Sequence, residues 1–301
     1  MRRAALALVL VLAPAACRRP PAVDPAYVAE IGTSRALRET RLRSENGWLT
    51  LVALHWLAPG ENLVGSDPAA AVSLGETGLP PRACAFVLGP DGRVTLHAEP
   101  GAPVAVNGAP PSAAPLATDR DGKPDVVTVG RARLTVIERG GRLALRARDP
   151  ESPRRTAFAG LDYFPVDTAL RVEGTFARYD APREIEVPSA QGPAQKATAP
   201  GVVRFELRGK KLELEPTVES PTDDTFFFVF GDATNGDGSY GAGRFLYAPV
   251  PKAGDTKVVL DFNLAQNPPC AFTPYATCPL PLPKNVLPLR VEGGEKAPAG
   301  H

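Results

Sequence analysis

The polar residues best suited to chemistry lie between positions 225 and 296, next to the strongly apolar run Thr225–Phe230. Asp261 and Asn263 occur in a second apolar stretch. Because side chains alternate along a strand, we expect both to project from one face. An acid, an amide, a phenol and a guanidinium that meet in one hollow could hold a small polar or anionic ligand. The candidate ligand-binding residues are Tyr240, Arg244, Asp261, Asn263, Asn267 and Glu295.

Two other interpretations of this segment stay open. A hydrolase would use the carboxylates of Asp232, Asp261 and Glu295 as acid and base, with Arg244 as an electrophilic clamp and Tyr240 as a donor. The chain has three histidines and no Gly-x-Ser-x-Gly elbow, His-Glu-x-x-His motif or glycine-rich phosphate loop, so we name no catalytic residue. Alternatively, Arg244 pairs with Asp261 in a buried structural network whose amides support the proline-rich loop.

A second charged group flanks Gly140-Gly141, a dipeptide typical of a type I′ hairpin turn because both turn positions need a positive φ. Like charges across a hairpin are unfavourable, so an anion or an acidic partner would explain Arg139, Arg142 and Arg146, our candidate anion patch. Arginine outnumbers lysine 26 to 8, so the face could instead be ordinary solvated surface or be neutralised by acids such as Asp149. The predicted cross-strand pairs are Arg139 with Arg142, Ile137 with Ala144, Thr135 with Arg146, and Arg133 with Arg148.

The first residues predict export. Two arginines precede an apolar run, residues 4–13, which is too short to cross a bilayer and is typical of a signal peptide. Ala15-Ala16-Cys17 then resembles a lipobox, whereas cleavage after Ala15 would suit an ordinary signal peptidase. We predict a signal peptide over residues 1–16, a tether over 17–25, and a place in the periplasm or cell envelope with a lipid anchor on Cys17.

The other cysteines fit an exported protein. Cys270 and Cys278 are eight positions apart in a proline-rich segment and predict a disulfide. Zinc fits less well, because histidines are few and no Cys-x-x-Cys pair is present. Cys84 lies in an apolar run and is expected to be a buried thiol. Residues 119–125 and 232–238 have calcium-like spacing but lack the closing glutamate of an EF-hand, so we predict no metal and no cofactor.

The elements that would position these residues are mostly strands. The chain has 28 glycines and 34 prolines among 301 residues, too many helix breakers for a helical bundle. Near-helical spacing predicts one helix over residues 26–45, and the apolar segment Trp48–Leu57 predicts a strand. The other predicted strands are Ala83–Leu88, Arg93–Ala98, Val104–Val106, Val126–Val129, Arg133–Glu138, Arg142–Arg148, Leu170–Tyr179, Glu184–Val187, Val202–Leu207, Lys211–Glu215, Thr225–Phe230, Arg244–Tyr247, Val258–Asn263 and Leu287–Val291.

This pattern predicts an all-β protein of two antiparallel β units with one short N-terminal helix. Residues 26–164 would form the helix and a sandwich-like unit. Residues 165–297 would form a barrel-like unit, because eight strands are enough to close a small barrel. The boundary falls near Phe164, after a turn-rich segment. The net charge of +1 lacks the basic surplus that nucleic-acid binding needs, so we expect no nucleic-acid partner.

A set of motifs spread over the chain carries a family resemblance. They are Gly47-Trp48-Leu49, Gly60-Glu61-Asn62, Gly65-Ser66-Asp67-Pro68, the Arg139–Arg146 hairpin, Tyr163-Phe164-Pro165, Tyr240–Leu246, Leu260–Asn263, Asn267–Phe272, Cys278–Pro281 and Gly294-Glu295-Lys296. Together they resemble the uncharacterised family called domain of unknown function 1684, and the resemblance covers nearly the whole mature chain. It implies no established activity. Members of the family look like exported or lipid-anchored bacterial proteins, which agrees with the predicted signal peptide.

These observations lead to one expected function and two alternatives. We expect a non-catalytic cell-envelope protein that binds a small polar or anionic ligand, or a protein partner, through the C-terminal motif. The alternatives are a carboxylate-dependent hydrolase and an envelope scaffold or interaction protein. In each case contact with the membrane would be made only through the lipid anchor.

Overall fold

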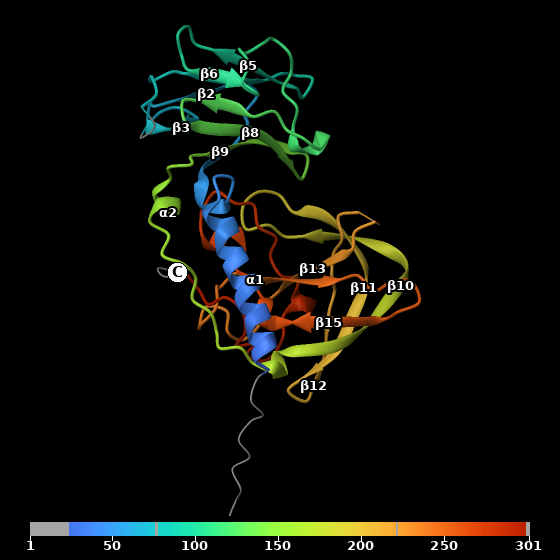
Figure 1. Ribbon diagram of the computed structural model, residues 1–301. Helices are drawn as coiled ribbons and strands as arrows, with labels where there is room; N and C mark the ends of the chain where they lie inside the picture. Colours follow the sequence, from blue (N-terminus) through green and yellow to red (C-terminus); the bar gives the residue numbers. More distant parts are fainter. Residues whose placement is uncertain (1–23, 76–77, 221, 299–301) are drawn as a thin grey trace, which may run out of the picture.

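The computed structural model describes residues 24–75, 78–220 and 222–298. Antiparallel strands dominate, and they form an N-terminal unit and a C-terminal unit, with a long helix lying along the second (Figure 1). The predicted all-β architecture with one N-terminal helix is confirmed. The predicted signal peptide, with Cys17, lies outside the described residues. Within the described ranges, no helix is long and apolar enough to cross a membrane.

Helix α1 spans Pro25–Arg43, close to the predicted 26–45. Asp24 caps its first turn, because the carboxylate accepts a hydrogen bond from the amide of Ala26 at 2.9 Å. Proline suits the first helical position because it has no amide hydrogen to leave unpaired. The remaining helical segments are short: α2 (Pro153–Thr156) and the 3₁₀ turns Trp48–Thr50, Asp119–Asp121, Thr168–Leu170, Phe262–Leu264, Pro269–Ala271 and Pro283–Asn285.

The N-terminal unit contains two sheets that share one core. One sheet has the strand order β1-β9-β8-β7-β6 and the other β3-β2-β4-β5, with antiparallel neighbours except for β2 and β3. Side chains from both sheets, including Phe86 and Leu134, are buried together, as in a sandwich. The strands are β1 (Leu51–Trp56), β2 (Gly60–Gly65), β3 (Val72–Ser73), β4 (Cys84–Leu88), β5 (Val94–Ala98), β6 (Val104–Val106), β7 (Val127–Val129), β8 (Ala132–Arg139) and β9 (Arg142–Arg148).

Details of this unit differ from the sequence expectation. Residues Trp48–Thr50 form a 3₁₀ turn, so the predicted strand starts later, at Leu51. Strand β2 was not predicted, because its glycines, acid and amide are typical of a turn. Its Asn62 is buried, and the side-chain amide donates to the carbonyls of neighbouring residues instead of meeting water. Cys84 is fully buried, as predicted, and burial raises the pKa of its thiol to about 12.

The C-terminal unit contains a four-stranded sheet in the order β12-β11-β10-β15 and a separate β13-β14 pair. The predicted eight-stranded closure into a barrel is wrong for the described residues. Two predicted strands are one long strand, β10, with an irregularity between Arg178 and Arg183. Residues 287–291 form no strand, and Pro288 has no amide hydrogen for a ladder. The strands are β10 (Arg171–Val187), β11 (Gln195–Leu207), β12 (Lys210–Leu214), β13 (Thr225–Phe230), β14 (Arg244–Pro249) and β15 (Lys257–Asp261).

Strand β13 connects the two units through its two apolar faces. On one face, Phe226, Phe228 and Phe230 are buried in the core of the C-terminal unit. On the other face, Val229 packs in a second cluster with Leu51 of β1 in the N-terminal unit. A strand that is apolar on both faces is expected to be covered on both sides, and here the N-terminal unit supplies part of the second cover.

Candidate functional site

The arginine hairpin has the predicted register. Strands β8 and β9 pair Arg139 with Arg142, Ile137 with Ala144, Thr135 with Arg146, and Arg133 with Arg148. Both turn glycines have a positive φ, 54° at Gly140 and 74° at Gly141. A Cβ on Gly140 would come within 3 Å of Pro193, so the tip of the hairpin packs closely against the connection between β10 and β11. The hairpin therefore reaches from the N-terminal unit to the C-terminal unit.

The middle of the arginine-bearing face is covered, whereas Arg142 near the tip is exposed. Arg146 is 8% exposed, and Ile137 and Ala144 beside it are buried. The guanidinium of Arg146 lies 5.7 Å from the ring centre of Trp48, and one of its nitrogens donates to Oγ1 of Thr277 at 3.4 Å. Since Thr277 belongs to the C-terminal unit, this part of the face lies between the two units.

The arginines of this face differ in their partners. Arg139 forms an ion pair with Asp119 at 2.7 Å, and Arg142 lies over the ring of Trp56 at 4.8 Å. Arg146 forms no ion pair with any described residue. Acids therefore neutralise part of the face, but Asp149 and Glu151 pair with Arg131, which precedes β8, and not with Arg139, Arg142 or Arg146. The other pairs are Arg133 with Glu45, Arg148 with the carbonyl of Gly47 and the hydroxyl of Thr50, and Arg131 with Asp149 and Glu151.

Arg146 is therefore a buried cation without a direct ion pair in the described chain, although the Asp119 carboxylate that pairs with Arg139 also acts on it. Its Nε is buried without a hydrogen-bond partner. Burial and the neighbouring charges of Arg139 and Arg148 lower the pKa of Arg146 to about 10, so it stays protonated at neutral pH. Burying a charge without a partner is costly, and an anion that approached this guanidinium would reduce the cost.

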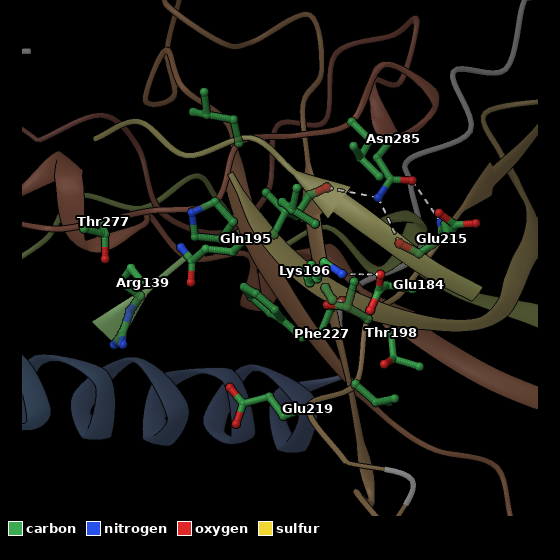
Figure 2. A pocket seen from close by; sticks show the side chains of 18 of the residues that line it. Arg139, Glu184, Gln195, Lys196, Thr198, Glu215, Glu219, Phe227, Thr277 and Asn285 are labelled. Carbon is green, nitrogen blue, oxygen red and sulfur yellow. Dashed lines mark hydrogen bonds and ion pairs between the residues drawn. The ribbon is translucent and has the colours of Figure 1, made fainter. Parts of the chain in front are cut away.

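A cavity of about 810 Å³ lies between the hairpin and the C-terminal unit, and its lining includes Thr277, the residue that Arg146 contacts, but not Arg146 itself. Figure 2 shows Arg139 and Thr277 at one end, and Glu215 with Asn285 at the other. Between them, Lys196 and Glu184 form an ion pair at 2.8 Å. The cavity is therefore polar and carries both signs of charge.

The far end of the cavity contains a buried carboxylate that sequence analysis missed. Oε1 of Glu215 accepts a hydrogen bond from the Tyr179 hydroxyl at 2.6 Å, and Lys284 forms an ion pair with Oε2. Asn285 exchanges two hydrogen bonds, each 2.9 Å long, with the backbone of Glu215. Burial and this carboxylate raise the pKa of Tyr179 to about 12. In the sequence, Glu215 only ends an alternating strand and gives no signal of burial.

Arg244, a candidate ligand-binding residue, lies inside the C-terminal core. It is fully buried and forms an ion pair with Oδ2 of Asp232 at 2.6 Å. A guanidinium nitrogen also donates to the carbonyl of Val291 at 2.7 Å. The expected pairing of Arg244 with Asp261 is therefore wrong. Its partner Asp232 belongs to the loop that follows β13, and Arg244 is the first residue of β14.

Asp261 and Asn263 do lie close together, but their shared partner is helix α1. The hydroxyl of Tyr27 donates to the Asp261 carboxylate at 2.8 Å and accepts from the Asn263 side-chain amide at 3.0 Å. Strand β15 ends at Asp261, whose carboxylate accepts from the Asn263 backbone amide and begins the following 3₁₀ turn. Thus the predicted shared strand face does not exist, although both residues meet the same hydroxyl.

Glu295 and Asn267 form a second contact with α1. Oε1 of Glu295 pairs with Nε of Arg38 at 2.8 Å, and Oε2 accepts from the backbone amide of Asn267 at 2.7 Å. Arg38 also donates to the Asn267 carbonyl at 2.9 Å. Burial raises the pKa of Glu295, while the Arg38 charge opposes this shift. None of the six candidate ligand-binding residues lines the cavity between the hairpin and the C-terminal unit, and a ligand-binding role for them stays a prediction.

The remaining candidates are Tyr240 and the cysteine pair. The Tyr240 hydroxyl donates to the carbonyl of Cys270 at 3.2 Å, and the Cys270 amide donates to Sγ of Cys278 at 3.0 Å. Both cysteines are free, so the structure does not contain the predicted disulfide. Among the described residues, no group of three or more His, Cys, Asp or Glu side chains could hold a metal ion.

Comparison with known proteins gives two matches of unknown function. A family model described as "Protein of unknown function (DUF1684)" matches residues 156–296, which include the six candidate ligand-binding residues but neither α1 nor the arginine hairpin. Among solved structures, a similar chain is an uncharacterized protein from gene locus rrnAC0354 of Haloarcula marismortui, solved by solution NMR. The match has 30% identity and a TM-score of 0.42, and it covers 50% of this chain and 83% of that chain. A search of curated proteins finds no match.

Proposed function

We propose that this chain, which belongs to the DUF1684 family of proteins of unknown function, is a non-catalytic cell-envelope protein that binds a small polar or anionic ligand between its two units. The observation that carries the proposal is Arg146. It is a buried guanidinium in contact with Thr277, which lines a polar cavity, and it forms no direct ion pair with a described residue. The proposed binding place is thus the anion patch of the hairpin rather than the C-terminal motif.

The cavity suggests the chemistry of the ligand. Its volume lies within the range of about 300–1,000 Å³ that is usual for small-molecule sites. At one end, Arg139 lines the cavity with its partner Asp119, and Arg146 lies behind Thr277, so a carboxylate or phosphate that displaced Asp119 would meet two guanidinium groups. At the other end, Glu215 is already paired with Lys284 and the Asn285 amide bonds to the backbone, whereas Gln195 and Thr198 bring polar side chains to the lining. A compact anion that also carries hydroxyl or amide groups fits this arrangement.

Binding is better supported than hydrolysis. The three carboxylates that a hydrolase would use, those of Asp232, Asp261 and Glu295, all accept hydrogen bonds from other parts of the chain. A general acid or base must reach the substrate, and groups held in this way are committed to the protein's own structure. The carboxylates therefore support the binding proposal over the hydrolase alternative.

Anion binding can be tested by thermal unfolding of the full chain with orthophosphate, citrate or neutral glucose. We expect citrate or phosphate to raise Tm and glucose to have no effect. An anion at a hundred times its Kd would stabilise the chain by about 2.7 kcal/mol. Arg146→Met should abolish the shift. Without anion, this variant should unfold no earlier than the parent, because it removes a buried charge that has no direct ion pair.

Arg93→Met is the matched control, because Arg93 is a largely exposed arginine of the same unit. It should keep the full response to the anion. Two results would contradict the proposal: an equal shift in Arg146→Met, or a fall in Tm of anion-free Arg146→Met. The second result would mean that Arg146 stabilises the fold and is not a ligand-binding residue.

Export and anchoring form the second part of the proposal, and the sequence of the leader supports them. We expect Cys17→Ala to move the protein from the membrane fraction to the soluble fraction of the cell envelope, because it removes the proposed lipid attachment site. Cys84→Ala removes a buried core thiol instead and should leave the protein in the membrane fraction. A mature N-terminus at Ala16, found by mass spectrometry, would contradict lipidation and indicate an ordinary signal peptidase.

A further inference from the structure

Two thiols of the C-terminal loop lie next to each other. Cys270 belongs to the 3₁₀ turn Pro269–Ala271, and its backbone amide donates to Sγ of Cys278 at 3.0 Å. The cluster that connects the two units holds both side chains and includes Leu51 and Val229. Packing and a hydrogen bond therefore fix the pair, so that one sulfur can reach the other without unfolding of the loop.

The two thiols differ in access to solvent. Cys270 is partly exposed, whereas Cys278 is 2% exposed. An external reagent can therefore approach Cys270 first. This asymmetry is typical of redox pairs, in which an accessible thiol reacts and a neighbouring buried thiol then resolves the product.

Hydrogen bonding also makes the pKa values of the two thiols differ. The Cys278 thiol donates to the Cys270 sulfur, which lowers the pKa of Cys270 and raises the pKa of Cys278. The Tyr240 hydroxyl also lowers the pKa of Cys270, and the charge of Arg146 acts to lower that of Cys278. Cys84, by contrast, is isolated in a core where burial raises its pKa to about 12. The more exposed thiol, that of Cys270, is thus also the one whose pKa is lowered, although the backbone amide of Cys270 acts to lower the pKa of Cys278.

We propose that Cys270 and Cys278 form a reversible redox pair, in which Cys270 attacks an external disulfide and Cys278 resolves the mixed disulfide. The Cys270 thiolate attacks one sulfur of a low-molecular-weight disulfide, and the other half leaves as a thiolate. Cys278 then loses its proton to solvent and attacks Sγ of Cys270, which expels the second half. The two protein thiols lose two electrons, and the small disulfide gains them and becomes two thiols.

This inference goes beyond ligand binding and does not depend on it. Export would place the pair where oxidised small thiols are present. Because the sulfurs lie in the cluster between the units, oxidation would link the loop to itself at the point where Leu51 of the N-terminal unit packs.

The test uses the full chain with Cys17→Ser, so that three thiols remain, and oxidised glutathione as the probe. We expect the folded protein to form the Cys270–Cys278 disulfide and release two glutathione molecules. Cys278→Ser should accumulate glutathione on Cys270. Cys270→Ser should show no adduct at Cys278, and Cys84 should react only after unfolding. Peptide mass spectrometry locates each adduct, and reduced glutathione should restore both thiols in the folded chain.

Several outcomes would overturn the proposal. An adduct on Cys278 in Cys270→Ser, together with none on Cys270 in Cys278→Ser, would reverse the roles. Two thiols as unreactive as Cys84 in the folded chain would exclude the pair. A disulfide that reduced glutathione opens only after unfolding would be structural rather than reversible.

A pH profile gives an independent readout of the role of Tyr240, which is a positioning residue in this scheme. The rate of Cys270 alkylation by iodoacetamide should rise with pH, with a midpoint below that of a free cysteine. Tyr240→Phe should move the midpoint to higher pH, because it removes the hydroxyl that donates to the Cys270 carbonyl and lowers the pKa of the Cys270 thiol. An unchanged midpoint in a folded Tyr240→Phe chain would overturn that role.

Discussion

Asp232→Asn is expected to lower the free energy of unfolding by about 3–5 kcal/mol, because it leaves a fully buried guanidinium without its counter-charge. Arg244 is 0% exposed and, with Asp232, ties the loop after β13 to the carbonyls of Val291 and Gly293. An asparagine can still hydrogen-bond but supplies no charge. Urea unfolding of the full chain, followed by fluorescence, measures the change as a shift of the midpoint.

Asp237→Asn is the matched control, because Asp237 lies in the same loop and its ion pair with Arg290 at 2.7 Å is exposed to solvent. Exposed pairs contribute little, so no resolvable change is expected. Arg244→Met combined with Asp232→Leu should recover part of the loss, since the two apolar side chains leave no uncompensated charge. Equal effects of Asp232→Asn and Asp237→Asn would show that burial does not govern the stability of this loop.

Local sequence rules predicted the arginine hairpin because its geometry is local. Two glycines with positive φ fix the register, and alternation then decides which face each arginine occupies. The same rules could not predict what covers that face. Its cover includes Trp48 from the preceding turn and Thr277, which is 131 positions from Arg146. Such a contact depends on how the two units meet.

The six C-terminal candidates show the same limit. Their residue types correctly indicated that polar groups in this segment need partners, but four of them, Asp261, Asn263, Asn267 and Glu295, find partners at the other end of the described chain. Tyr27 is 234 positions from Asp261, and Arg38 is 257 positions from Glu295. Helix α1 was grouped with the N-terminal strands because it precedes them, yet Tyr27 and Arg38 of the helix bond to the C-terminal motif.

The strand predictions were wrong where the backbone hydrogen bonds do not follow the pattern of apolar and polar side chains. Residues 287–291 alternate apolar and polar side chains, but their backbone amides bond to loop groups such as the Asp232 carboxylate, which accepts from the amide of Val291. Strand β2 was missed for the opposite reason, since its residues are typical of a turn and its pairing with β4 fixes it. In both cases tertiary pairing decides the outcome, and single-residue preferences carry little information about it.

Arg38→Met is expected to detach helix α1 from the C-terminal unit before the rest of the chain unfolds. The variant leaves Glu295, which is 1% exposed, without its cation, and the cost of such a change is about 3–5 kcal/mol. Methionine keeps an apolar side chain against the nearby ring of Phe272. Native-state hydrogen exchange should therefore show α1 amides exchanging about a hundredfold faster or more, because every 1.4 kcal/mol or so is tenfold.

Arg41→Met is the matched control, because Arg41 is an exposed arginine in the last turn of the same helix. It should leave exchange in α1 close to that of the parent. In Arg38→Met, amides of the buried strand β13 should keep their protection, since its phenylalanines pack in a core that excludes the Arg38–Glu295 pair. If α1 and β13 lose protection together, the helix does not open as a separate unit, and the polar residues of the motif instead stabilise the whole C-terminal unit through α1.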